Sequence, residues 1–250
     1  MPQEINRNEE AAAETIGFLY IFAIVMLSIS MIYVMGYPML QSSMDESIFE
    51  STEQSFIVLQ SDMKMVAFDQ VPVKSLRIQL QGATLSVTKN SNITITIDYL
   101  DGTPQNVTHY DTGEIEYQKS DKFLTYENGG VWKRYPGSIM VSNPHIYSTI
   151  EDGSNSTTIG IVSIQGASSV GGNGIATLSM KYNENNKSVI IKPSGLVNVT
   201  LIINSTYAKD WENYLESRGF NTNLTGSSLT AMRNNTMLVV GQHMVDVDIT

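Results

Sequence analysis

One uninterrupted apolar stretch near the start of the chain constrains its fold more than any other feature. No charged residue occurs between Thr15 and Met44, and residues 16–35 are almost wholly apolar. About 20 residues, at about 1.5 Å per residue, span the roughly 30 Å of hydrocarbon in a bilayer. A core helix of a soluble protein rarely runs this long without a polar face. The stretch therefore predicts a membrane-spanning helix.

A cleaved secretory signal is the main alternative to a retained membrane helix. Such a signal has an apolar region of about 7–15 residues after a basic start, and it ends at a small-residue cleavage site. Here the apolar run is longer, and residues 36–40 (GYPML) match such a site poorly. We therefore expect the segment to be retained.

Basic residues and N-glycosylation sequons both favour a cytoplasmic N-terminus. Arg7 precedes the apolar stretch and no Lys or Arg follows it until Lys64, and basic residues prefer the cytoplasmic side. Asn-x-Ser/Thr sequons, which accept glycans outside the cell, all lie downstream of the stretch. The candidate glycosylation sites are Asn92, Asn106, Asn155, Asn186, Asn198, Asn204, Asn223 and Asn234. Residues 41–250 are thus expected outside the cell membrane.

The periodicity of the apolar residues changes twice after the membrane stretch. It first indicates one helix over residues 42–68, ending before Pro72, with an apolar stripe of Met44, Ile48, Thr52, Phe56, Leu59, Met63 and Val66. From Val73 apolar and polar residues alternate, as in strands with one wet face. Candidate strands are 76–80, 84–88, 93–99, 113–118, 123–127, 131–135, 138–141, 145–150, 157–165, 174–182, 188–192, 197–204 and 236–249.

These elements predict an α+β fold: a long N-terminal transmembrane and amphipathic helix, then an antiparallel β-sandwich or barrel that needs no parallel sheet. One short late helix is expected over residues 207–218, ending at Gly219, with aromatic residues that pack onto the sheet. The predicted organisation is a cytoplasmic tail (1–14), a transmembrane helix (15–37), an amphipathic helical extension (38–71) and an extracellular β domain (72–250).

Composition argues against several classes of function. The formal net charge is -10, which provides no positive field for nucleic acid. The chain has no Cys and only three His, at positions 109, 145 and 243, and none of the three lies in a metal or nucleophile motif. The Gly-rich segment 164–174 lacks the lysine of a phosphate-binding loop and is expected to be a flexible surface loop. We therefore predict no enzyme activity, no catalytic or metal site and no cofactor.

Two short segments carry a family resemblance. Residues 11–17 (AAAETIG), followed by the apolar run to Met35 and Gly36, resemble the start of archaeal type IV pilin-like proteins. The order of elements, with a late Trp211-x-x-Tyr214-Leu215 helix, is similar to a group of archaeal pilin-like surface proteins of unassigned function. Glu9 and Glu10 stand where substrates of the prepilin peptidase carry Lys or Arg. The resemblance therefore implies a pilin-like architecture more strongly than a pilus.

The sequence favours a single-pass archaeal surface protein with a structural or adhesive role, glycosylated outside the cell. Its N-terminal helix would contact membrane lipid or copies of itself. One alternative is a polymerising pilin-like filament subunit. Another is an ectoenzyme or solute-binding receptor, which would need a cleft lined by His109, His145 or His243 together with carboxylates.

Overall fold

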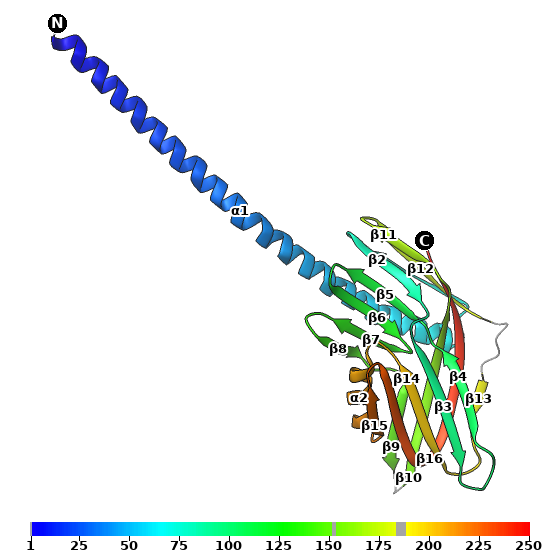
Figure 1. The fold of residues 1–250 in the computed structure, drawn as a ribbon. Helices are drawn as coiled ribbons and strands as arrows, with labels where there is room; N and C mark the ends of the chain where they lie inside the picture. The colour runs from blue at the N-terminus through cyan, green and yellow to red at the C-terminus, as the bar shows by residue number, and fades with distance from the viewer. Residues whose placement is uncertain (1, 152–153, 184–188) are drawn as a thin grey trace. The chain divides into compact units, whose positions relative to one another are not determined.

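A computed structural model describes residues 2–151, 154–183 and 189–250. The chain divides into two compact units, Met1–Ser51 and Thr52–Thr250. Helix α1 (Pro2–Ala67) forms the described part of the first unit and contributes its last turns to the second (Figure 1). Pro38 lies inside this helix without ending it. The helix ends within one residue of the predicted boundary, ahead of Pro72, as the restricted backbone before a proline requires.

The part of α1 in the second unit packs through one apolar stripe. Its fully or nearly buried members are Thr52, Phe56, Leu59, Met63 and Val66, as the spacing predicts. Polar side chains beside the stripe tie the helix to loops and strands. Gln60 Nε2 donates hydrogen bonds to the carbonyl oxygens of Gly129 and Asn143, and Lys133 Nζ lies 2.8 Å from Glu53 Oε2. The helix therefore contributes to the core of this unit.

Two β-sheets make up the rest of the second unit (Figure 1). The ten-stranded sheet has the strand order β1-β12-β16-β14-β3-β4, with β10, β13 and β15 also paired to β16 and β9 paired to β10. Its strands are β1 (Val73–Gln79), β3 (Asn92–Tyr99), β4 (Asn106–Asp111), β9 (Ile146–Glu151), β10 (Ser154–Gln165), β12 (Ile175–Tyr182), β13 (Val189–Ile191), β14 (Val197–Asn204), β15 (Asn221–Thr225) and β16 (Ser228–Ile249).

The second sheet is smaller and antiparallel throughout its described pairs. Its strand order is β11-β2-β5-β6-β7-β8, and β6 and β7 form a hairpin whose turn contains Asn128 and Gly129, both at positive φ. Its strands are β2 (Ala83–Thr88), β5 (Glu114–Lys119), β6 (Lys122–Glu127), β7 (Gly130–Arg134), β8 (Ser138–Ser142) and β11 (Ser169–Gly172). The predicted α+β class, with a long helix, antiparallel sheets and one late helix, is confirmed.

The structure departs from the predicted strands in five places. β10 and the second half of β16 pair in parallel, from Asn155 opposite Thr236 to Gln165 opposite Asp246, a single exception among the described strand pairs to the expected antiparallel pairing. The polar strands β4 and β15 were missed because they lack apolar alternation, and β16 begins earlier than predicted. The segment predicted as a flexible loop includes strand β11.

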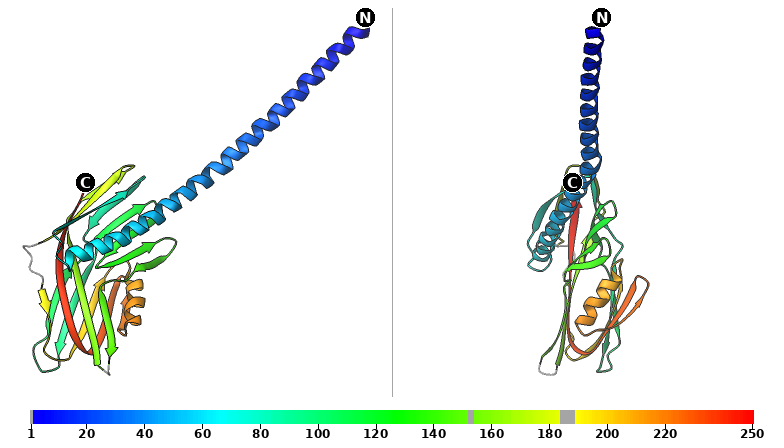
Figure 2. Two further views of the ribbon diagram at one scale, coloured as in Figure 1. Left: turned by 180° about the vertical axis from the view of Figure 1, so that it is seen from behind. Right: turned by 90° about the vertical axis from the view of Figure 1, so that its left-hand side faces the viewer.

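The late helix α2 (Ala208–Ser217) lies beside β15, as Figure 2 shows in orange. It buries Trp211, Tyr214 and Leu215, so its aromatic stripe packs onto the protein as predicted. The ring of Trp211 lies 5.0 Å from that of Trp132 on β7, and Trp132 stacks on Tyr207 at 5.8 Å. These aromatic contacts link the smaller sheet to the α2 region.

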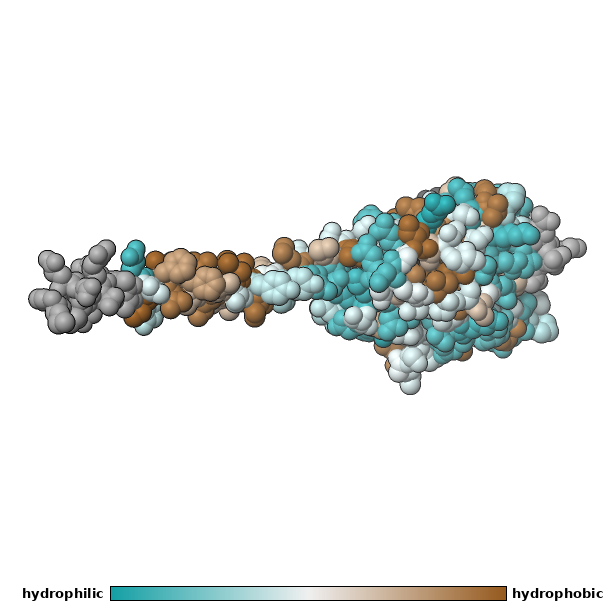
Figure 3. All heavy atoms as spheres, turned by 90° about the horizontal axis from the view of Figure 1, so that it is seen from above, coloured by the Kyte–Doolittle hydropathy of each residue, from teal (hydrophilic) through white to brown (hydrophobic). Residues whose placement is uncertain are grey.

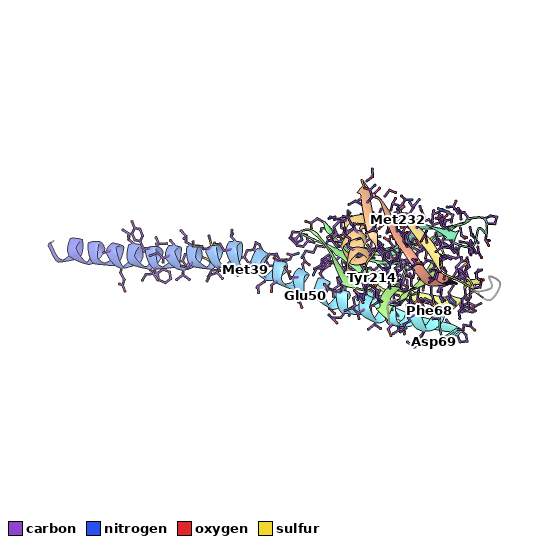
Figure 4. All side chains as sticks on the ribbon, turned by 90° about the horizontal axis from the view of Figure 1, so that it is seen from below. Met39, Glu50, Phe68, Asp69, Tyr214 and Met232 are labelled. Carbon is purple, nitrogen blue, oxygen red and sulfur yellow. The ribbon has the colours of Figure 1, made fainter. Side chains whose placement is uncertain are left out.

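Phe68 lies just past the end of α1 (Figure 4). Its ring makes edge contacts with His145 at 5.0 Å and with His243 at 4.8 Å. A Cβ on Gly160 of β10 would approach the Phe68 ring to 2.9 Å, so the absence of a side chain there makes room for the ring.

Candidate functional site

The apolar stretch of α1 exposes its side chains on every side of the helix. The large apolar residues between Ile16 and Met35 range from 48% exposed at Val25 to 72% at Ile32, so no face is buried. Figure 3 shows this stretch as a continuous apolar surface. Among the described residues, α1 is the one helix that is long enough and apolar enough to cross a membrane. Exposure of such an apolar surface to water is unfavourable, whereas contact with lipid or with a second apolar helix would bury it.

The polar groups within this stretch are satisfied by its own backbone. Ser28 Oγ donates to the carbonyl oxygen of Ile24, and Ser30 Oγ donates to that of Met26, each at 2.8 Å. In hydrocarbon a hydroxyl has no water to bond, and a bond to the carbonyl four residues earlier removes most of its desolvation penalty. Both serines are therefore compatible with an apolar medium.

Two stacked tyrosines mark the C-terminal end of the apolar stretch. The rings of Tyr33 and Tyr37, one helical turn apart, lie 5.7 Å from centroid to centroid. Tyrosine favours the boundary between hydrocarbon and water, because its ring is apolar and its hydroxyl is polar. Past them, Asp45 and Glu46 are the first charged residues after Glu14. The stretch thus has the polarity profile of a membrane span.

A second site is a buried carboxyl cluster where strands β5 and β6 meet α2. Glu127, at the end of β6, is fully buried and accepts hydrogen bonds from Ser205 Oγ at 2.7 Å and Trp211 Nε1 at 2.9 Å. Glu114 is its direct cross-strand partner on β5 and accepts bonds from Thr88 Oγ1 and Asn90 Nδ2. Glu127 therefore joins the smaller sheet to α2 and to the turn that precedes it.

Burial dominates the electrostatics of this cluster. It raises the pKa of Glu127 to about 7, against the lowering effect of the Ser205 and Trp211 hydrogen bonds. Burial, with a contribution from Glu114, also raises the pKa of Glu116. A carboxyl group that takes part in catalysis or binds a ligand must be accessible, yet Glu127 is 0% exposed. The arrangement suits a structural connection.

The three histidines do not form a common site with the carboxyl cluster. His109 lies on the exposed strand β4, where Nε2 is 3.3 Å from Asp111 Oδ1 and Nδ1 is 2.9 Å from Thr94 Oγ1. His145 and His243 instead contact Phe68. Burial lowers the pKa of His145 to about 4, aided by the positive charge of Lys64, and burial also lowers the pKa of His243.

Buried Glu127 and buried His145 have opposite effects on how the stability depends on pH. The fold keeps a proton on Glu127 that the unfolded chain releases, so stability falls as pH rises from about 4.5 to 7. In the folded chain His145 stays neutral at pH values where the unfolded chain binds a proton on it. The free energy of unfolding therefore rises as the pH increases from about 4 to 6.5. The two slopes oppose each other in the window they share.

We expect Glu127→Gln to unmask the histidine slope, so that its free energy of unfolding rises by about 3 kcal/mol between pH 4 and 6.5. His145→Phe is expected to unmask the glutamate slope, a fall of similar size between pH 4.5 and 7. Urea unfolding of the detergent-solubilised chain at several pH values measures both. Parallel pH profiles for the two variants would contradict this assignment.

The sequon asparagines differ in how the fold uses them. Asn155 Nδ2 donates to the carbonyl oxygens of Asn234 and Asn235, and Asn198 Oδ1 accepts from the Asn235 backbone N–H. Asn204 Nδ2 donates to Asn92 Oδ1, and Asn106 Oδ1 accepts from Thr108 Oγ1. Asn223 and Asn234 are exposed. Asn186 lies outside the described residues. The glycosylation of these sites stays a prediction.

A depression of about 340 Å³ lies between β8 and α2. Met140, Asn143, Asp210 and Arg218 are among its lining residues, and no histidine is. In the described part of the chain, no group of three or more His, Asp or Glu residues is placed to hold a metal ion. The carboxyl cluster itself escaped the sequence analysis, because the pairing of β5 with β6 and the position of α2 bring its members together. The alternation in residues 114–127 carried no signal of a buried acid.

The comparisons with known proteins found one similar archaeal protein and one matching family model. It is similar to an uncharacterised protein of Archaeoglobus fulgidus, with 27% identity over 275 residues that cover 90% of each chain. No solved structure is significantly similar to it. A family model described as "Family of unknown function (DUF7289)" matches residues 11–248, which include the apolar helix and nearly all of the β domain. The chain therefore belongs to this family of unknown function, DUF7289.

Proposed function

We propose that this chain is a single-pass surface protein, held in the cell membrane by residues 15–37, with its β domain outside the cell. The observation that carries the proposal is the apolar stretch of α1, exposed on all sides and with both serine hydroxyls bonded internally. Insertion into lipid buries that apolar surface, and each Å² removed from water contributes a favourable free energy of about 25 cal/mol. The role of the domain is structural or adhesive, as in the pilin-like architecture that the N-terminal segment resembles.

The domain has properties that suit a structural role outside the cell. Its surface polarity comes mainly from Ser, Thr, Asn and Gln, and charged residues make up 16% of the chain. The extensive β pairing, which joins β16 to five other strands within the described residues, restrains the ten-stranded sheet along most of its length. Residues of the helical extension are tied to the same unit by Gln60 and by the Glu53–Lys133 ion pair.

Site-directed labelling tests the proposed topology directly. The chain has no cysteine, so a single introduced cysteine is a unique label site. Ser194 lies on an exposed part of the β domain, and Gln3 lies ahead of the apolar stretch. A membrane-impermeant maleimide is expected to label Ser194→Cys in intact cells, and Gln3→Cys only after lysis. Labelling of Gln3→Cys alone in intact cells would contradict the proposal.

A polymerising filament subunit is the second candidate function, because copies of the apolar helix could cover one another in place of lipid. N-terminal sequencing of surface material distinguishes the two. A new terminus within residues 10–14, together with filaments under the electron microscope, supports assembly. An intact terminus without filaments supports the membrane anchor.

A further inference from the structure

The outer face of strand β15 presents a complete glycosylation sequon to solvent. Asn223 and Thr225 are both exposed on it, and Asn221 precedes them on the same face. The alternate residues Thr222 and Leu224 face the other way, opposite the buried Ala231 and Leu229 of β16. Strand alternation thus places the acceptor amide of Asn223 and the sequon hydroxyl of Thr225 on the same solvent-exposed face of the strand.

We propose that Asn223 is N-glycosylated in the folded domain, and that Asn155, Asn198, Asn204 and Asn234 stay unmodified. This inference rests on the proposed function, because the acceptor must face the outside of the cell. The transfer enzyme reads both the asparagine and the hydroxyl two residues later. In a folded acceptor, both groups must therefore be open to it.

The other sequons named here fail this requirement, each for a visible reason. The amide groups of Asn155, Asn198 and Asn204 take part in hydrogen bonds that hold neighbouring strands. Asn234 has an exposed side chain, but its sequon residue Thr236 is fully buried. The Thr236 hydroxyl lies 2.8 Å from that of Thr157, which is the equally buried sequon residue of Asn155.

These polar contacts gather where β16 changes its pairing partners. Asn235 has a positive φ of 53° there, and the register of β14 against β16 shifts between Val197 and Val199. Asn155 and Asn198 supply the hydrogen bonds that the disrupted ladder leaves open. Asn155 and Asn198 thus have a structural role that a glycan on the amide nitrogen would disturb. Among the hydrogen bonds of the described residues, none gives Asn223 a comparable structural role.

The reaction needs a lipid-phosphate-linked oligosaccharide as its second substrate. The Asn223 amide nitrogen forms a bond to the anomeric carbon of the sugar and loses one proton. The bond from that carbon to the phosphate oxygen breaks, and the lipid phosphate leaves with the electron pair. No electron is gained or lost overall, so no oxidant or reductant is required.

A glycan at Asn223 has a physical consequence for the sheet. Within the described residues β15 pairs with β16 alone, so its other edge carries unpaired backbone groups. Exposed edges invite pairing with another chain, and bulky or charged groups suppress it. Met232, labelled in Figure 4, is exposed opposite Asn221 on the same face. A glycan there would cover an apolar side chain and shield the edge.

Glycopeptide mass spectrometry of the full chain tests the proposal. The protein is purified from membranes of an archaeal host whose own surface glycoprotein is found to carry N-glycans. Trypsin releases residues 219–233, which contain Asn223 as their single sequon, and residues 234–250, which contain Asn234 as theirs. We expect the first peptide to carry the glycan mass, and the peptides with Asn155, Asn198, Asn204 and Asn234 to be unmodified.

Variants on the same face provide matched controls. Asn223→Gln and Thr225→Val are expected to lose the glycan mass from residues 219–233 completely, whereas Thr225→Ser retains it. Asn221→Gln, an exposed asparagine without a hydroxyl two residues later, is expected to leave it unchanged. All three positions are exposed, so these four variants are expected to fold as the parent does.

The surface label at Ser194→Cys separates the two proposals. If that label reacts in intact cells while residues 219–233 carry no glycan, the inference is overturned and the proposed topology stands. A glycan on Asn155, Asn198, Asn204 or Asn234 also overturns it, because modification would then ignore the folded structure. If the label reacts only after lysis, the topology and the inference fail together.

Discussion

Replacing Ile24 and Leu27 together by aspartate is expected to remove the chain from the membrane. Both residues lie near the middle of the apolar stretch and are exposed by more than half, at 65% and 69%. A charged aspartate at the centre of a membrane helix costs about 3 kcal/mol, so the pair costs about 6 kcal/mol. Flotation of membranes on a density gradient measures the result as a loss of the chain from the floating fraction.

A control on the same helix separates this effect from a general effect of added charge. Ile57 and Val58 are also exposed, at 37% and 48%, but they follow the apolar stretch by more than five turns. Ile57→Asp with Val58→Asp adds the same charge, and this variant is expected to float with the membranes as the parent does. Flotation of both double variants to the same extent would argue against a membrane role for residues 16–35.

Truncation of Trp211 to alanine is expected to give the largest loss of stability in the β domain. The ring is fully buried against Trp132 and Tyr214, and the cavity left by an alanine costs about 3–5 kcal/mol. The variant also leaves Glu127 Oε1 without its donor at 2.9 Å. An unsatisfied buried acceptor adds about 1–3 kcal/mol.

Trp211→Phe tests the two contributions separately, because it keeps a buried ring but removes the N–H donor. We expect it to lose less than half of what the alanine variant loses. Urea unfolding of the detergent-solubilised full chain, followed by circular dichroism in the β-sheet region, gives both free energies. An alanine variant within about 1 kcal/mol of the parent would show that the Trp211 cluster does not hold α2 to the sheets.

Local patterns in the sequence were sufficient for the helices and for most of the strands. The apolar stripe from Thr52 to Val66 is buried as its spacing predicts, and α2 ends next to Gly219, which has the positive φ of a helix C-terminus. The alternation of Ile93, Ile95 and Ile97 places all three in the core. Each of these features depends on neighbours within a few residues.

Long-range pairing could not be read in the same way. The parallel pair of β10 and β16 brings together segments about 80 residues apart, and no local pattern distinguishes it from an antiparallel pair. β15 is rich in Asn and Thr, so its strand character depends on the edge offered by β16. The Glu127 cluster likewise exists only after β5, β6 and α2 have met.

Alkaline carbonate extraction of the intact, unmodified chain tests the membrane anchor most directly. Carbonate strips peripheral proteins from membranes, whereas a helix that spans the bilayer stays in the pellet until detergent is added. We predict that the full-length chain remains in the membrane pellet and is released by detergent. Recovery of the full-length chain in the carbonate supernatant, with its N-terminal segment still attached, would contradict the account.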